Sequence, residues 1–141
     1  MHYRIEAKAD ITVIDVIGLL GHLYALADIA FIGGSLIPFG GHNPLEPAAF
    51  SKPIFFGPFM GDFPEISDML LSNGGAIRVN NADEIFENAR RLLKNRQQSE
   101  KMGAHAYSVF QSNQGAVEKV LKVLDSHMPS SDKSAMEKDQ V

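Results

Sequence analysis

Residues 33–50 combine a bendable backbone with a few polar side chains, as a ligand-binding loop would. The segment is GGSLIPFGGHNPLEPAAF, with four glycines and three prolines. Glu46 carries the only formal charge between Asp28 and Lys52. Glycines allow backbone N–H groups to approach a bound phosphate closely. The pattern therefore predicts an anion site built without basic side chains, and it raises the question of why one carboxylate lies within it.

Residues 43–46 favour a helix that begins inside this loop. Asn43 is a good N-cap, Pro44 suits the first helical position, and Glu46 can complete a capping box. The free N–H groups at such a helix start lie at the positive end of the helix dipole, which favours a phosphate. Two interpretations of Glu46 stay open at this point: a capping residue or a ligand-binding residue.

The other loop residues also have simpler explanations. Gly33 and Gly34 are equally compatible with a tight turn, and His42 with an ordinary loop histidine. The sequence contains neither a G-x-G-x-x-G motif nor a Walker loop ending in Gly-Lys-Ser or Gly-Lys-Thr. The phosphate interpretation therefore depends on where the loop lies in the fold.

Short apolar runs alternate with helical patterns along the chain, which predicts the α/β class with a parallel sheet of about four strands. Strands are expected at residues 11–14, 29–32, 54–56 and 76–79. Helices are expected at residues 17–27, 45–50 and 64–73, after an N-cap at Asn81, and at 97–111 and 115–126.

The predicted sheet explains how the loop residues come together. In open parallel sheets, ligands bind beyond the carboxyl ends of the strands. Gly33 and Gly34 directly follow the expected strand at 29–32, at that edge of the sheet. Gly40 and Gly41 lead into the expected helix at the same edge. Both glycine pairs are therefore expected to face one crevice. The candidate binding residues are Gly33, Gly34, Ser35, Gly40, Gly41, His42, Asn43 and Glu46.

The composition limits the class of protein. A chain of 141 residues with 45% hydrophobic residues can form one domain with a genuine core. Its net charge of −4 argues against general binding to nucleic acid, which needs clustered Lys and Arg. The absence of cysteine excludes disulfides and thiolate metal sites. Apolar runs far shorter than ~20 residues, and the lack of a signal core, lead us to expect a cytoplasmic protein.

The last part of the chain has a different composition. Residues 127–141 are polar and offer almost nothing to bury, so we expect a disordered tail there. The expected organisation is one domain over residues 1–126 followed by this tail.

Two runs of the chain resemble the C-terminal domain of the 3-deoxy-D-manno-octulosonic acid (Kdo) transferases: ALADIAFIGGSLIPFGGHNPLEPAAFSKPIFFGP and EISDMLLSNGGAIRV. The resemblance covers about residues 13–125, and GGHNPLEPA is its most specific segment. Those enzymes transfer Kdo from CMP-Kdo to the lipid A precursor of lipopolysaccharide. They have the GT-B architecture, in which two Rossmann-like domains face one cleft.

The resemblance implies that this chain is a partial Rossmann-like domain that binds CMP-Kdo or CMP without a metal or another cofactor. Gly33, Gly34 and Ser35 would line the donor phosphate and sugar. Asn43 would lie at the phosphate-facing helix end, and Glu46 would accept hydrogen bonds from the ribose hydroxyls. No Asp-x-Asp pair, typical of a metal-dependent site, occurs in the sequence. The parent enzyme would be an inverting transferase, peripheral on the cytoplasmic face of the inner membrane.

The resemblance also implies that parts of the enzyme lie outside this chain. In the resembling enzymes the general base and the acceptor site, which takes the lipid A precursor, belong to the N-terminal domain. Their Pro-Arg-His loop, which helps to hold the donor, does not occur in this sequence. Residues 1–10 are too few for the strand and helix that should precede residue 11. We therefore expect an N-terminally incomplete fragment that is inactive alone.

Two other functions stay open at this point. The chain could belong to another GT-B glycosyltransferase or a UDP-sugar epimerase, because a Gly-rich turn and a ribose-binding Glu occur throughout that wider class. It could also be a stand-alone interaction module with no nucleotide site.

Overall fold

The sheet of this protein is built from three short strands that are largely apolar. The structure, a computed structural model, describes residues 9–127. Strands β1 (Ala30–Phe31), β2 (Ile54–Phe56) and β3 (Ala76–Arg78) lie in the order β1-β2-β3, and both neighbouring pairs are parallel. All of β2 is buried, as expected for a wholly apolar strand in the middle of a parallel sheet. The α/β class and the parallel sheet are confirmed.

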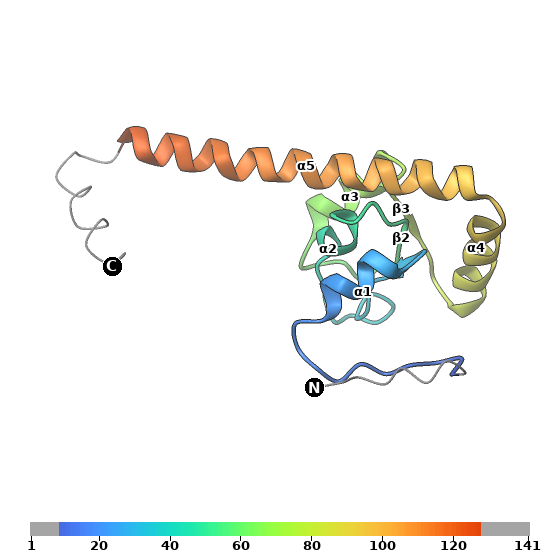
Figure 1. Cartoon of the computed structure of the whole chain (residues 1–141). Helices are drawn as coiled ribbons and strands as arrows, with labels where there is room; N and C mark the ends of the chain where they lie inside the picture. The colour runs from blue at the N-terminus through green and yellow to red at the C-terminus, as the bar shows by residue number, and fades with distance from the viewer. Residues whose placement is uncertain (1–8, 128–141) are drawn as a thin grey trace.

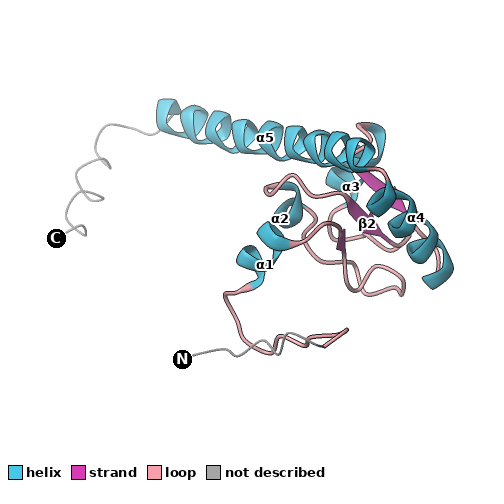
Figure 2. Ribbon diagram, turned by 45° about the vertical axis from the view of Figure 1, so that its right-hand side comes forward, coloured by secondary structure: helices cyan, strands magenta, loops and turns pink. Residues whose placement is uncertain are grey.

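Five helices accompany the strands in the described part of the chain. They are α1 (Leu20–Leu26), α2 (Leu45–Ala48), α3 (Pro64–Ser72), α4 (Ala82–Lys94) and α5 (Arg96–His127). Figure 1 shows α5 running along one side of the molecule, with its C-terminal part extending beyond the other elements. Figure 2 shows the three strands between α3 and α5 on one side and α4 on the other. None of these helices is both long enough and apolar enough to cross a bilayer.

The core has two parts because side chains of a strand alternate between the faces of the sheet. Ile54 and Phe56 face one side, where they pack with Leu70 of α3 and with α5. Phe55 faces the other side, where it packs with Leu92 of α4. Helix α5 supplies buried residues to both clusters, so it ties the two faces together.

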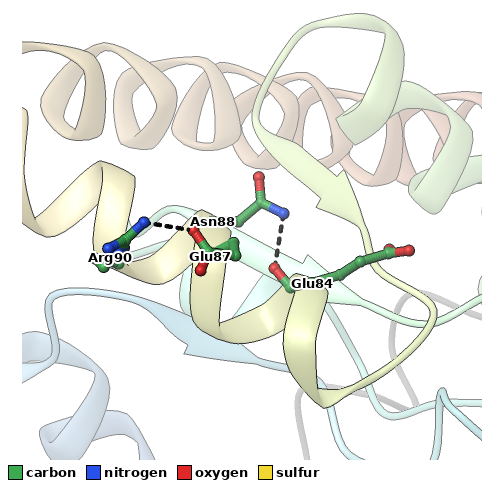
Figure 3. Close-up of polar contacts among 4 residues, drawn as sticks. All are labelled: Glu84, Glu87, Asn88 and Arg90. Atoms are coloured by element: carbon green, nitrogen blue, oxygen red, sulfur yellow. Dashed lines mark hydrogen bonds and ion pairs between the residues drawn. The ribbon is translucent and has the colours of Figure 1, made fainter.

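Helix α4 begins where the sequence predicts. The Asn81 side chain accepts a hydrogen bond from the Glu84 N–H at 2.9 Å. The Glu84 carboxylate accepts one from the Asn80 N–H, also at 2.9 Å. Further along the helix, Arg90 pairs with Glu87 at 2.8 Å, and Asn88 donates to the Glu84 carbonyl (Figure 3). The predicted N-cap at Asn81 is confirmed, and these polar contacts stabilise α4 locally.

The expected strand at residues 11–14 is not formed. Ile11 and Val13 are 84% and 85% exposed, and β1 pairs only with β2 in the described part of the chain. A strand needs a neighbour to take its backbone hydrogen bonds, and an apolar pattern alone does not supply one. The sheet therefore has three strands among the described residues, where the sequence predicted about four.

Two helix boundaries also differ from the prediction. The two helices expected at 97–111 and 115–126 are one continuous helix, α5, because a single Gly115 costs only about 1 kcal/mol in a helix interior. Helix α1 begins at Leu20 because Gly18 has a φ of +95°, which is not helical. The disordered tail expected at residues 127–141 stays a prediction, because His127 is the last residue of α5 and residues 128–141 lie outside the described part.

Helix α5 approaches the rest of the domain closely at one glycine. A Cβ placed on Gly103 would overlap the backbone carbonyl of Ser51. Gly115, in the same helix, has open space around the position of its missing Cβ. These two glycines therefore form a matched pair for testing how α5 packs.

We expect Gly103→Ala to destabilise the domain by on the order of 1–3 kcal/mol, because the added methyl group overpacks a close contact. Gly115→Ala should instead stabilise it by up to about 1 kcal/mol, because alanine favours a helix interior over glycine. Urea unfolding of both variants measures the two effects. Changes of the same sign and size would show that α5 does not lie against Ser51.

Candidate ligand-binding site

A cavity of about 560 Å³ lies at the carboxyl edge of the sheet. Its walls come from α1, from the loop after β1, from the start of α2 and from the loop after β2. The residues that line it are Leu20, Tyr24, Ile32, Gly33, Gly41, His42, Asn43, Glu46, Asp62 and Phe63. This is the edge at which parallel sheets bind ligands.

Five of the eight candidate residues line this cavity: Gly33, Gly41, His42, Asn43 and Glu46. The other three, Gly34, Ser35 and Gly40, are not among the lining residues. Whether any of the eight contacts a ligand stays a prediction. The structure does bring both ends of the glycine-rich segment to one place, as expected from the sequence.

The glycine-rich segment closes on itself. The Gly41 N–H donates to the Gly34 carbonyl at 3.1 Å, and the His42 N–H donates to the Gly33 carbonyl at 3.2 Å. Gly34 and Gly41 have φ angles of +68° and +77°, which suit glycine. The N–H groups of Gly41 and His42 are therefore occupied, whereas those of Gly33 and Gly34 donate to no group within residues 9–127.

Ser35 fixes this segment to the loop after β2. Its buried hydroxyl donates to the Ile32 carbonyl at 2.5 Å and accepts from the Gly57 N–H at 2.8 Å. Its carbonyl accepts from the Phe59 N–H at 2.9 Å. A Cβ on Gly57 would overlap the Ser35 carbonyl, so a glycine is needed there. Ser35 thus has a positioning role, and its predicted contact with a ligand remains a prediction.

Asn43 and Glu46 differ in how they relate to α2. The Asn43 side chain accepts from the Leu45 N–H at 3.0 Å, a contact typical of a helix start, although the N-cap position of the observed helix is Pro44. The Glu46 carboxylate has no hydrogen-bond partner among the described residues, so the predicted capping box is not closed there. Helix α2 has only four residues, fewer than predicted. Any dipole that it directs at a ligand is correspondingly small.

Tyr24 was not among the candidate residues, because its helix showed only an apolar pattern. It lies one turn after Leu20 on α1, and both residues line the cavity. Burial raises the pKa of the Tyr24 phenol, and the nearby Glu46 carboxylate raises it further. The phenol is thus a neutral hydrogen-bond donor close to an acceptor-only carboxylate.

Asp62 and Phe63 come from the loop after β2, which reaches the cavity from another side. The Asp62 N–H donates to the Gly40 carbonyl at 3.0 Å. Phe63 is partly buried and packs on the larger core cluster. The sequence signal for this loop is weak: it is simply the next loop at the same edge of the sheet.

The formal charges that line the cavity are two carboxylates, Glu46 and Asp62, and no Lys or Arg is among its lining residues. His42 is the histidine among these lining residues. Among the side chains of residues 9–115, no group of three or more His, Cys, Asp or Glu is arranged to hold a metal ion. The expectation of a metal-free site stays a prediction.

Comparisons with known proteins point to one family, although no family model matches the chain. The chain is 40% identical over 115 residues to the 3-deoxy-D-manno-octulosonic acid transferase of Haemophilus influenzae, a match that covers 81% of this chain and 27% of the relative. It is 35% identical over 123 residues to the enzyme of the same name from Rickettsia typhi, covering 85% and 26%. The chain therefore spans about a quarter of the length of these curated relatives.

A solved structure has the same fold. The crystal structure of the C-terminal CMP-Kdo binding domain of WaaA from Acinetobacter baumannii matches with a TM-score of 0.66 and 32% identity. The match covers 70% of this chain and 51% of that one. Sequence and fold thus agree on the same group of relatives.

We expect Ser35→Ala to lower the free energy of unfolding by about 1–3 kcal/mol, because the Gly57 N–H loses its buried acceptor. Ser72→Ala removes an exposed serine hydroxyl that bonds only within α3, and should change stability by less than about 0.5 kcal/mol. Thermal unfolding of both variants is the measurement. A Ser35→Ala variant as stable as Ser72→Ala would show that the two loops are not held together at this point.

Proposed function

This chain belongs to the 3-deoxy-D-manno-octulosonic acid transferase family, whose C-terminal domain it matches, and from this premise we propose that it binds CMP-Kdo in the cavity at the carboxyl edge of its sheet. The parent enzyme would transfer Kdo to the lipid A precursor with inversion. The observation that carries the proposal is the position of the glycine-rich segment and Glu46 around one cavity, in the fold of a CMP-Kdo binding domain.

Glu46 is the residue proposed to hold the ribose. The Asn43 side chain already accepts from the Leu45 N–H at the start of α2, so the Glu46 carboxylate is left without a hydrogen-bond partner in the described part of the chain. An ionised carboxylate can accept hydrogen bonds from two neighbouring hydroxyls. Tyr24, close to Glu46, adds a donor on the same side of the cavity. This arrangement suits a diol, and the ribose of CMP carries one.

The phosphate would be held by backbone groups. The unoccupied N–H groups of Gly33 and Gly34 are the available donors at the end of β1. The carboxylates of Glu46 and Asp62 oppose an anionic ligand, since like charges about 4 Å apart repel by ~1 kcal/mol even in water. We therefore propose that this chain binds CMP weakly by itself, and that cationic groups outside it strengthen donor binding in the parent enzyme.

Sugar transfer itself would require the N-terminal acceptor domain, which would supply the general base and the site for the lipid A precursor. In such a reaction the base deprotonates the acceptor hydroxyl, which attacks the anomeric carbon while CMP leaves. We propose that the parent enzyme works at the cytoplasmic face of the inner membrane. The alternative of a UDP-sugar enzyme has no support among the relatives compared above.

The test is a calorimetric titration of the chain with CMP. We expect Glu46→Gln to weaken CMP binding by on the order of tenfold, because hydrogen bonds to a charged group are worth about 1.5–3 kcal/mol. Glu65→Gln is the matched control, since Glu65 lies in the first turn of α3, outside the cavity. Unaltered CMP affinity in Glu46→Gln would contradict the ribose assignment.

A second titration separates the nucleotide classes. CMP should bind more tightly than UMP or UDP, whereas the reverse order would support a UDP-sugar enzyme. The absence of binding by any of the three nucleotides would favour an interaction module.

A further inference from the structure

Asp62 is a second carboxylate in the cavity, and its position is set by the backbone around it. The Asp62 N–H donates to the Gly40 carbonyl at 3.0 Å. A Cβ on Gly40 would lie 2.5 Å from Asp62 Oδ2 and 2.7 Å from Oδ1, so the carboxylate lies directly against this glycine. Gly40 also has a φ of +103°, a conformation that suits glycine. The glycine-rich segment thus folds closely against the Asp62 side chain.

Among the side chains of residues 9–115, Asp62 takes part in no salt bridge and its carboxylate accepts no hydrogen bond. Arg90 of α4 pairs with Glu87 and Arg96 of α5 pairs with Glu100, and none of these residues lines the cavity. An ionised carboxylate is an acceptor only, so a ligand group beside Asp62 must be a hydrogen-bond donor.

We infer that Asp62 binds a hydroxyl group of the transferred sugar. This inference rests on the proposed function, in which Glu46 on α2 holds the ribose diol. The phosphate is excluded as a partner because it would be repelled by the carboxylate. Asp62 reaches the cavity from the loop after β2, whereas Glu46 and Tyr24 reach it from α2 and α1. The donors of such a ligand that remain unassigned are the cytosine amino group and the sugar hydroxyls, and a comparison of CMP with CMP-Kdo distinguishes them because only CMP-Kdo carries the sugar.

Under this assignment, the Asp62 carboxylate raises the affinity for CMP-Kdo and lowers the affinity for CMP. With the sugar present, its carboxylate gains a charge-assisted hydrogen bond. With CMP alone, the same charge only repels the nearby phosphate. A group that merely supports the loop would instead affect both ligands alike.

The experiment is a calorimetric titration of wild-type chain, Asp62→Asn and Asp68→Asn with CMP-Kdo and with CMP. We expect Asp62→Asn to weaken CMP-Kdo binding by about tenfold, the loss of one hydrogen bond to a charged group. The same variant should bind CMP as tightly as the wild type or up to about fivefold more tightly, with the gain shrinking in high salt. Asp68 lies on α3 and does not line the cavity, so Asp68→Asn should change neither affinity.

The possible results separate this inference from the proposed function. A wild-type chain that binds neither ligand would overturn both. Suppose that the wild type binds CMP-Kdo, and that Asp62→Asn lowers the affinities for CMP-Kdo and CMP equally or changes neither. The sugar-hydroxyl role of Asp62 is then wrong, while the proposed function stands. Thermal unfolding of Asp62→Asn should match that of the wild type, because the side chain is exposed. A lowered midpoint together with equal losses for both ligands would assign Asp62 a structural role.

Discussion

The contact between Ser35 and Gly57 is the constraint on which the cavity depends. It joins the segment after β1 to the segment after β2 through one buried hydroxyl, which is both a donor and an acceptor. The close approach is possible because residue 57 has no Cβ. Each of these segments directly follows a strand of the sheet. The contact therefore fixes the positions of two irregular loops relative to the sheet.

This constraint explains why a site with few charges can still be specific. The loops present backbone N–H groups and two carboxylates from separate elements, and the intervening glycines allow the backbone to fold tightly around them. Binding groups held by a rigid scaffold lose little entropy when a ligand arrives. In the proposed site the negative charge of the lining would oppose anionic ligands and favour ligands rich in hydroxyl groups. Specificity in this account therefore comes from hydrogen-bond acceptors in fixed positions.

The sequence predicted those parts of the structure that local patterns determine. Strands β1 and β2 are continuous apolar runs and β3 is apolar up to Arg78, and Asn81 with Glu84 has the spacing of a helix start. The false strand at residues 11–14 shows the limit, because a pattern cannot reveal whether a partner strand lies beside it. Most of the candidate residues around Glu46 reached the cavity, since they are close in sequence. Tyr24 was missed because only tertiary packing brings α1 to the cavity.

The central claim is that a cytidine nucleotide binds at the carboxyl edge of this sheet. Amide chemical shifts of the isotope-labelled chain, followed while CMP is added, test it most directly. The account predicts that the largest changes fall on Gly33, Gly34, His42 and Glu46, with smaller ones on the loop around Asp62. Changes confined to α4 and α5, or no changes at saturating CMP, would contradict it.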